Sequence, residues 1–283
     1  MTPARRLDVG DGLVARVVPG GEERILWIHG YSLDSRIWDE LWGHLPGRHH
    51  IGIDLPGHGQ SRPLRPGLDL VGLARCLGRI AFEQNVRHLV GLSFGGMVAL
   101  QVAIEHPHAF ASLVLGAPAL GGGPLDRHAQ ARNFELSRMY HARGPGLWLR
   151  DLWMTAPPDI FTGAAKQPEL WRRLRSIVAE HAWTELADSR MMHALATHRQ
   201  TAEDLKPITA ASLVLVGDED AEAFKRCAEL IRRGIPRCRR LYLERTGHLT
   251  LLERASTVHT VLDEHFRTAS RQSARGVSGS LVG

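Results

Sequence analysis

A serine flanked by glycines lies near the middle of the chain, in the pentapeptide Gly91-Leu92-Ser93-Phe94-Gly95. The apolar residues before it predict a short buried strand, and the apolar run from Met97 to Ile104 predicts a buried helix after it. A serine on so tight a strand-to-helix turn adopts a strained backbone and raises its hydroxyl above the sheet. The next N–H, that of Phe94, then points at the group that the hydroxyl attacks. The pattern predicts that Ser93 is a nucleophile.

Such a serine needs a base and an acid, because a hydroxyl is a poor nucleophile at its own pKa. His248 is the best candidate base: it follows a predicted strand, Gly247 leaves room beside it, and imidazole titrates near neutral pH. Asp220, just past another strand end, can hold the ring and stabilise the imidazolium. The neighbouring Asp218 and Glu219 are alternatives for the acid. A second oxyanion donor is expected from the N–H of Tyr31, beside that of Phe94.

The elements that must position these residues form an alternating pattern of strands and helices. Apolar runs predict strands at residues 13–18, 25–28, 51–53, 89–92, 111–116, 212–216 and 240–243. Helices are predicted between them, for example from Ser35 to about Leu45 and after an Asp69 cap. This alternation favours an α/β fold with a doubly wound, mostly parallel sheet and right-handed crossovers.

The alternation stops after Pro118. Residues 121–206 show little strand character, contain four tryptophans, and are divided by glycines and prolines, so we expect a helical cap inserted between core segments 1–120 and 207–266. The tryptophans imply an apolar ceiling over the serine. The segment 267–283 is rich in Ser, Gly and Arg without apolar periodicity, and is expected to be disordered. The four tryptophans are Trp148, Trp153, Trp171 and Trp183.

Composition limits the possible partners. The 283 residues carry a net charge of +5, but the arginines are scattered rather than clustered as a nucleic-acid surface would require. The three cysteines show no Cys-x-x-Cys spacing and no signal peptide is evident, so we expect a cytoplasmic protein. No apolar run is long enough to span a membrane, so we expect no membrane insertion. The histidines lack regular metal-ligand spacing, so neither a metal nor a cofactor is expected. The oligomeric state stays open.

Several motifs in order resemble the α/β-hydrolase superfamily, in its capped group of esterases, enol-lactone hydrolases, epoxide hydrolases and carbon–carbon bond hydrolases. The matching segments span about Leu13 to Phe266 and comprise His29-Gly30, Asp54-Leu55-Pro56-Gly57-His58-Gly59-Gln60-Ser61, Gly91-Leu92-Ser93-Phe94-Gly95-Gly96, Gly217-Asp218-Glu219-Asp220 and Gly247-His248. The resemblance places the acid three residues after the glycine, at Asp220, although the proline usual a few residues later is missing. A serine at the nucleophile position argues against the aspartate-based epoxide hydrolase and dehalogenase mechanisms. His29 is expected to order the oxyanion turn, and Asp54 and His58 to shape the loop after their strand.

The sequence therefore predicts a serine hydrolase that cleaves a small, largely apolar carboxylic ester or lactone through an acyl-enzyme. The same triad can serve a carbon–carbon bond hydrolase or a cofactor-free lyase-type enzyme of aromatic or polyketide metabolism, because fold and triad do not separate these reactions. A non-catalytic ligand-binding protein on the same scaffold is the alternative from another class. Arg132, Arg143 and Arg150 of the expected cap could hold a substrate carboxylate or lie in solvent.

Overall fold

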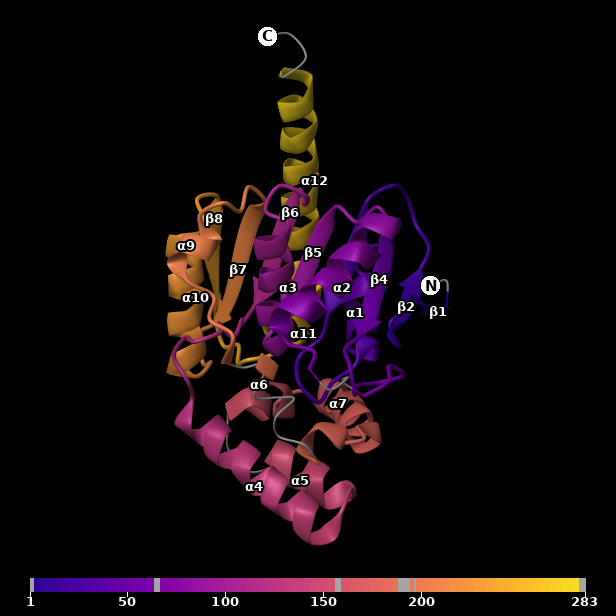
Figure 1. The fold of residues 1–283 in the computed structure, drawn as a ribbon, viewed down its shortest axis with the longest axis vertical. Coiled ribbons are helices and arrows are strands. Elements are labelled where there is room, and N and C mark those ends of the chain that lie inside the picture. Colours follow the sequence, from indigo (N-terminus) through magenta and orange to yellow (C-terminus); the bar gives the residue numbers. More distant parts are fainter. Residues whose placement is uncertain (1–2, 64–66, 156–158, 188–193, 196, 280–283) are drawn as a thin grey trace.

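The computed structural model describes residues 3–63, 67–155, 159–187, 194–195 and 197–279. Within them, eight strands form one sheet in the spatial order β1-β2-β4-β3-β5-β6-β7-β8 (Figure 1). The strands are β1 (Arg5–Asp8), β2 (Val14–Val18), β3 (Arg24–Ile28), β4 (His49–Asp54), β5 (His88–Leu92), β6 (Ser112–Gly116), β7 (Ala211–Gly217) and β8 (Cys238–Leu243).

All pairings from β4 to β8 are parallel, whereas β1 and β2 form an antiparallel edge. The prediction of a mostly parallel α/β sheet is thus confirmed. Strand β1 was not predicted, since Arg5, Arg6 and Asp8 are exposed and leave no apolar alternation in the sequence. Strand β5 lies between β3 and β6, so the residues that follow it reach the middle of the sheet edge.

Helices cover both faces of the sheet (Figure 1). One apolar cluster joins one face to α2, α3, α9 and α10, and a second joins the other face to η1, α1, α11 and α12. Successive strand residues alternate between the clusters, as pleating requires: Leu26 packs in the first and Trp27 in the second. The bounds are η1 (Ser35–Trp38), α1 (Asp39–Gly43), α2 (Leu70–Glu83), α3 (Phe94–Glu105), α9 (Ala202–Leu205), α10 (Glu222–Gly234), α11 (Thr250–Glu253) and α12 (Ala255–Gly279).

The segment between β6 and β7 forms short helices, which Figure 1 shows grouped beside one end of the sheet. They are α4 (Arg127–Arg143), α5 (Leu147–Thr155), η2 (Asp159–Phe161), α6 (Thr162–Ala165), α7 (Pro168–Glu180) and η3 (Thr184–Leu186). We call this group the cap. The helix α9, inside the predicted range 121–206, packs instead against α10 of the core through Leu205.

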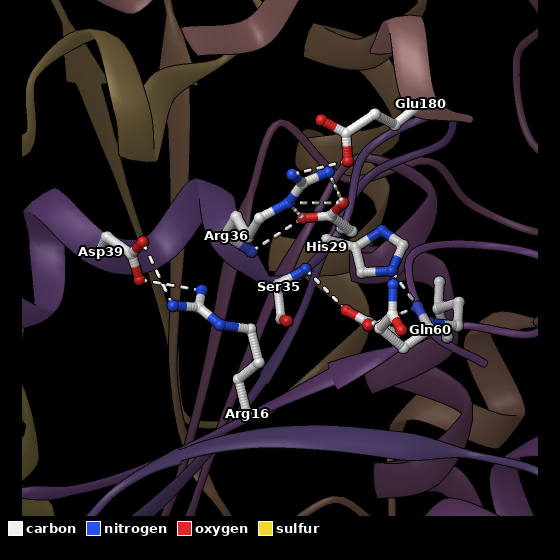
Figure 2. Close-up of polar contacts among 10 residues, drawn as sticks. Arg16, His29, Ser35, Arg36, Asp39, Gln60 and Glu180 are labelled. Atoms are coloured by element: carbon white, nitrogen blue, oxygen red, sulfur yellow. Dashed lines mark hydrogen bonds and ion pairs between the residues drawn. The ribbon is translucent and has the colours of Figure 1, made fainter. Parts of the chain in front are cut away.

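Ion pairs tie the cap to the core. Arg36 of η1 pairs with Glu180 of the cap helix α7 at 2.8 Å (Figure 2) and with Asp34 at 2.6 Å. Asp34 also caps η1 by accepting the backbone N–H of Arg36, so the helix begins one residue after Asp34 rather than being capped by Ser35. The arginine therefore fixes the start of η1 and one end of α7 together.

The last helix departs from the expected disorder after Phe266, because α12 continues to Gly279. Ala269 is buried, Ser270 Oγ lies 3.3 Å from His88 Nε2, and Gln272 accepts a hydrogen bond from Arg237. These contacts anchor the turns that follow Phe266. Farther along, α12 extends past the sheet at the end opposite the cap (Figure 1). Residues 280–283 lie outside the described part of the chain.

Candidate active site

Ser93 occupies the turn between β5 and α3, with a positive φ of 56° and a ψ of −118°. This conformation is strained for a residue with a side chain. The flanking glycines make the turn possible: a Cβ on Gly91 would collide with the backbone of Gly95, and one on Gly95 would collide with the backbone carbonyl of His29. The strand and helix therefore approach as closely as the sequence pattern predicted, and they hold the serine at the carboxyl edge of the sheet.

His248 lies between Ser93 and Asp220. Its Nε2 is 2.8 Å from Ser93 Oγ and its Nδ1 is 2.9 Å from Asp220 Oδ1. Both His248 and Asp220 are buried, and the ring of Phe224 packs 4.0 Å from the imidazole ring, centre to centre. A carboxylate only accepts hydrogen bonds, so Nδ1 donates to Asp220 and Nε2 is free to accept the serine hydroxyl proton. The three side chains thus have the geometry of a nucleophile, a base and an orienting acid.

The two other acidic residues considered from the sequence point elsewhere. Asp218 Oδ1 accepts the backbone N–H of Thr246 at 3.0 Å, and this hydrogen bond lowers the pKa of the Asp218 carboxyl. Glu219 forms an exposed ion pair with Lys166 at 2.5 Å. Asp218 therefore stabilises the turn that leads to His248, while Asp220 contacts the imidazole itself.

The turn after β3 brings the Tyr31 N–H to the same edge. A Cβ on Gly30 would lie 3.5 Å from Ser93 Cβ, in ordinary contact. Within the described residues, neither the N–H of Tyr31 nor that of Phe94 donates a hydrogen bond. Two unused N–H groups beside the serine hydroxyl are what an oxyanion hole requires.

Two buried histidines hold this turn. His29 Nε2 accepts the N–H of Leu55 at 2.9 Å and its Nδ1 donates to the carbonyl of Gly30 at 2.8 Å. His58 Nε2 accepts the N–H of Ser32 at 3.1 Å. Burial lowers the pKa of both rings, so both are neutral near pH 7 and keep the acceptor nitrogen that these bonds need.

Asp54 at the end of β4 fixes the neighbouring loop. Its carboxylate accepts the N–H of Ser35 at 2.9 Å and the N–H of Gln60 at 2.8 Å, and both donor residues are labelled in Figure 2. His29, Asp54 and His58 thus occupy the supporting positions that the sequence predicted for them.

A cavity of about 310 Å³ opens beside Ser93 and His248 and extends under the cap. Most of its wall is apolar, and Asn133 and Ser137 of α4 together with Glu185 of η3 supply further polar groups. The described lining residues are Gly30, Tyr31, Leu33, Ser93, Phe94, Ala119, Ala129, Asn133, Ser137, Trp153, Ile160, Phe161, Glu185, Leu186, Phe224, His248 and Leu249.

The cap tryptophans contribute to this cavity less than expected. Trp153 lines it and donates from Nε1 to Ser32 Oγ at 2.7 Å, whereas Trp183 packs behind Tyr31. Trp148 and Trp171 are absent from the described lining. The apolar ceiling therefore combines one tryptophan with Phe161, Ile160 and Leu186.

The three cap arginines also lie away from the described cavity wall. Arg132 pairs with Glu135, Arg150 pairs with Asp151, and Arg143 stacks on Trp148 at 4.5 Å. The charged group that does line the cavity is Glu185, which sequence reasoning missed. A single acid between apolar residues carries no local signal, because its burial depends on distant contacts.

Among the described residues, no cluster of three or more His, Cys, Asp or Glu side chains could hold a metal ion. A search of the same residues for a helix long and apolar enough to cross a membrane finds none.

Comparisons with known proteins match the chain to one protein family and to several characterised enzymes. A model described as "Alpha/beta hydrolase family" matches residues 25–260. The chain is 31% identical over 151 residues to 2-succinyl-6-hydroxy-2,4-cyclohexadiene-1-carboxylate synthase of Citrobacter koseri, covering 52% of this chain and 55% of that protein. It is 25% identical over 258 residues to monoacylglycerol lipase abhd6-A of Xenopus laevis, covering 85% and 74%. Matches to two curated relatives span only 27% and 55% of their lengths.

A solved structure of a thermophilic esterase from Thermogutta terrifontis superposes with a TM-score of 0.72 at 23% identity, covering 90% of this chain and 94% of that one. At this identity the likeness concerns the fold.

Proposed function

Because the chain belongs to the alpha/beta hydrolase family, we propose that it is a serine hydrolase that cleaves a small, largely apolar carboxylic ester or lactone. The observation that carries the proposal is the hydrogen-bonded series Ser93, His248 and Asp220 at the wall of an apolar cavity. Two of the curated relatives are lipases, which supports the reaction class.

In the proposed reaction, Ser93 Oγ attacks the substrate carbonyl while His248 Nε2 takes the hydroxyl proton. Asp220 stabilises the imidazolium that forms. The N–H groups of Tyr31 and Phe94 hold the oxyanion, and removing one such donor typically costs about 10²–10³ in rate. His248 then returns the proton to the leaving alcohol oxygen as the tetrahedral intermediate collapses to an acyl-enzyme.

In the second half of the reaction, His248 takes a proton from water as the water oxygen attacks the acyl carbon. Collapse of the second tetrahedral intermediate breaks the bond to Ser93 Oγ, returns the proton to that oxygen and releases the acid. The step needs no metal or cofactor. The cavity volume of about 310 Å³ and its apolar wall favour a short acyl or alcohol chain.

A carbon–carbon bond hydrolase or lyase-type enzyme on the same triad is the second candidate, and the likeness to the Citrobacter koseri synthase favours it. The charge of the cavity weighs against the particular product printed in that relative's name, which bears carboxylate groups. The described lining residues include no lysine or arginine, and they include the acidic Glu185. An anionic ligand would meet repulsion without a compensating cation.

The test is covalent labelling by a fluorophosphonate, followed by intact mass and peptide mapping, with Ser93→Ala as the control. We expect one adduct on Ser93 and none on the variant, followed by turnover of short esters or lactones. Acid quenching during turnover of a slow ester should trap acyl-protein on Ser93. Full esterase activity of the folded Ser93→Ala variant would refute the proposal. Labelling of Ser93 with no ester or lactone turnover would favour the carbon–carbon or lyase-type reaction.

A further inference from the structure

Glu185 is an acidic residue placed in the wall of an otherwise apolar cavity. It belongs to the cap element η3, and its side chain is 6% exposed. Placing a carboxylate in such surroundings costs free energy unless hydrogen bonds compensate it. In this chain the hydrogen bonds reach only one of the two carboxylate oxygens, which points to a ligand for the other.

One carboxylate oxygen receives two hydrogen bonds. Tyr31 donates its hydroxyl proton to Oε1 at 2.7 Å, and His181 Nε2 lies 2.9 Å from the same oxygen. Burial raises the pKa of the Glu185 carboxyl, but the hydrogen bond and charge of His181 outweigh it and hold the pKa at about 2. Glu185 is therefore an anion across the working pH range.

The other oxygen, Oε2, is buried and accepts no hydrogen bond from the part of the chain that the structure describes. Buried carboxylate oxygens in folded proteins are nearly always hydrogen-bonded, so an unpartnered one needs an explanation. Glu185 forms part of the cavity wall, so a small rotation of its carboxylate on binding would let a donor on a ligand in the cavity reach Oε2.

The backbone next to Glu185 is strained as well. Trp183, which precedes η3, has the left-handed angles φ 56° and ψ 24° although it carries a large side chain. Its ring packs against His181 at 4.6 Å and is buried. Strain at a position held by such packing is typical of sites where a neighbouring group must be presented in one orientation. The neighbour here is Glu185.

We propose that Glu185 is a specificity-determining residue, which accepts a hydrogen bond from a hydroxyl or ammonium group on the substrate chain. The inference rests on the proposed ester or lactone hydrolysis and narrows its substrate class to chains that carry a hydrogen-bond donor away from the reacting carbonyl. Tyr31 sets the spacing: its backbone N–H belongs to the oxyanion turn and its hydroxyl to Glu185, so about one tyrosine side chain separates the carbonyl oxygen from the donor.

The test compares straight-chain acyl esters of one leaving group, each made in three forms: terminal methyl, terminal hydroxyl and terminal ammonium. For wild-type protein we expect kcat/KM to favour one donor-bearing form over the methyl form by about 10- to 100-fold at one chain length, the range of hydrogen bonds to a charged acceptor. Whether the hydroxyl or the ammonium form is preferred identifies the donor. Equal kcat/KM for all three forms at every length would overturn the inference.

The Glu185→Gln variant locates the effect. Its amide oxygen can keep the bonds from Tyr31 and His181, while the NH₂ group replaces the acceptor Oε2 with a donor. We expect the preference for the donor-bearing ester to fall to about unity, because the donor-bearing form loses its advantage over the methyl form. The matched control is Ser137→Ala, which removes another polar group from the same cavity wall and should leave the preference unchanged. Loss of preference in Ser137→Ala but not in Glu185→Gln would assign the recognition to α4 and refute our proposal.

A merely structural role for Glu185 would lower kcat/KM for all forms alike. Binding measured by calorimetry with the Ser93→Ala variant separates this inference from the proposed function, because it needs no turnover. Tighter binding of the donor-bearing ester that disappears in Ser93→Ala/Glu185→Gln supports the role of Glu185 even where hydrolysis fails. Equal binding of the three forms refutes it, whatever the outcome of labelling at Ser93.

Discussion

Asp220 and Asp218 lie two residues apart on the loop after β7, but Asp220 contacts the imidazole of His248 whereas Asp218 accepts the backbone N–H of Thr246. We predict that Asp220→Asn lowers kcat for ester hydrolysis by about 10⁴, the effect of the same replacement in serine proteases, and that Asp218→Asn lowers it by less than about tenfold. The paired variants make the same chemical change on one loop, so each serves as the control for the other.

The magnitude for Asp220 follows from its bond to the imidazole. The carboxylate accepts the Nδ1 proton of His248, which leaves Nε2 without a proton and able to accept one from Ser93. An asparagine amide at this position can donate to Nδ1 and so stabilise the tautomer with a proton on Nε2. That tautomer cannot act as a base toward Ser93, and a neutral amide does not stabilise the imidazolium.

The magnitude for Asp218 is small for a different reason. Asp218 Oδ1 accepts the backbone N–H of Thr246, and an asparagine oxygen can accept the same proton. The change weakens a charge-assisted hydrogen bond without removing it, and at this exposed position water screens the lost charge. His248, two residues farther along, keeps its position.

The assay is ester turnover over a range of pH, together with the rate of fluorophosphonate labelling and the thermal unfolding temperature of each variant. Labelling should slow in parallel with kcat for Asp220→Asn, because both depend on deprotonating Ser93. The reasoning would be wrong if the folded Asp218→Asn variant lost about 10⁴ in kcat while Asp220→Asn kept most of its activity.

The buried carboxylate of Glu253 accepts the N–H groups of Gly247 and Leu249, on either side of His248, and Glu253→Gln replaces one of its two acceptor oxygens. We expect initial rates of ester hydrolysis to show kcat lowered about 10- to 100-fold with KM nearly unchanged. Burial lowers the pKa of His50 and of His265 to about 4, so between pH 6.5 and 4 the unfolded state binds more protons than the folded state. The free energy of unfolding should therefore fall from pH 7 to pH 5, by up to about 2 kcal/mol for each histidine. Denaturant unfolding at the two pH values measures this loss, and His265→Gln should make it smaller. Gly95→Ala forces a methyl group into the backbone of β3 and should lower the unfolding temperature steeply, whereas equal stability of variant and wild type would contradict the close packing of the serine turn.

Much of the core could be predicted because Ser93 directly follows the buried strand β5, and Asp220 lies on the loop after the buried strand β7. The runs that form β3, β5 and β7 are continuous and apolar, and in a parallel sheet their carboxyl ends meet at one edge. That topology places Ser93 and the loop that carries both Asp218 and Asp220. The choice of Asp220 over Asp218 needed the resemblance to a family, since a difference of two residues on a loop has no periodic signal.

The parts that could not be predicted depend on contacts between distant segments. Glu185 is 154 residues from its partner Tyr31, and no local pattern marks a buried acid. Strand β1 has exposed side chains and exists through pairing with β2. The turns of α12 after Phe266 are anchored by single contacts such as Ala269 and Ser270, which a Ser- and Arg-rich composition conceals.

Tyr31 connects the proposed oxyanion hole to the proposed donor-binding residue Glu185, so we expect the two to be coupled in kcat. Its backbone belongs to the oxyanion turn of the core, and its hydroxyl donates to Glu185 of the cap. In the proposed reaction, a substrate that donates a hydrogen bond to Glu185 therefore also acts on Tyr31, the residue whose N–H is proposed to bind the developing oxyanion. Binding energy from the remote donor group can then be used to orient the carbonyl, which raises kcat as well as lowering KM. Tyr31→Phe separates the two effects, because it breaks the connection while leaving both the N–H and Glu185 in place. For a donor-bearing ester we expect this variant to lose the advantage in kcat and to keep most of the advantage in KM.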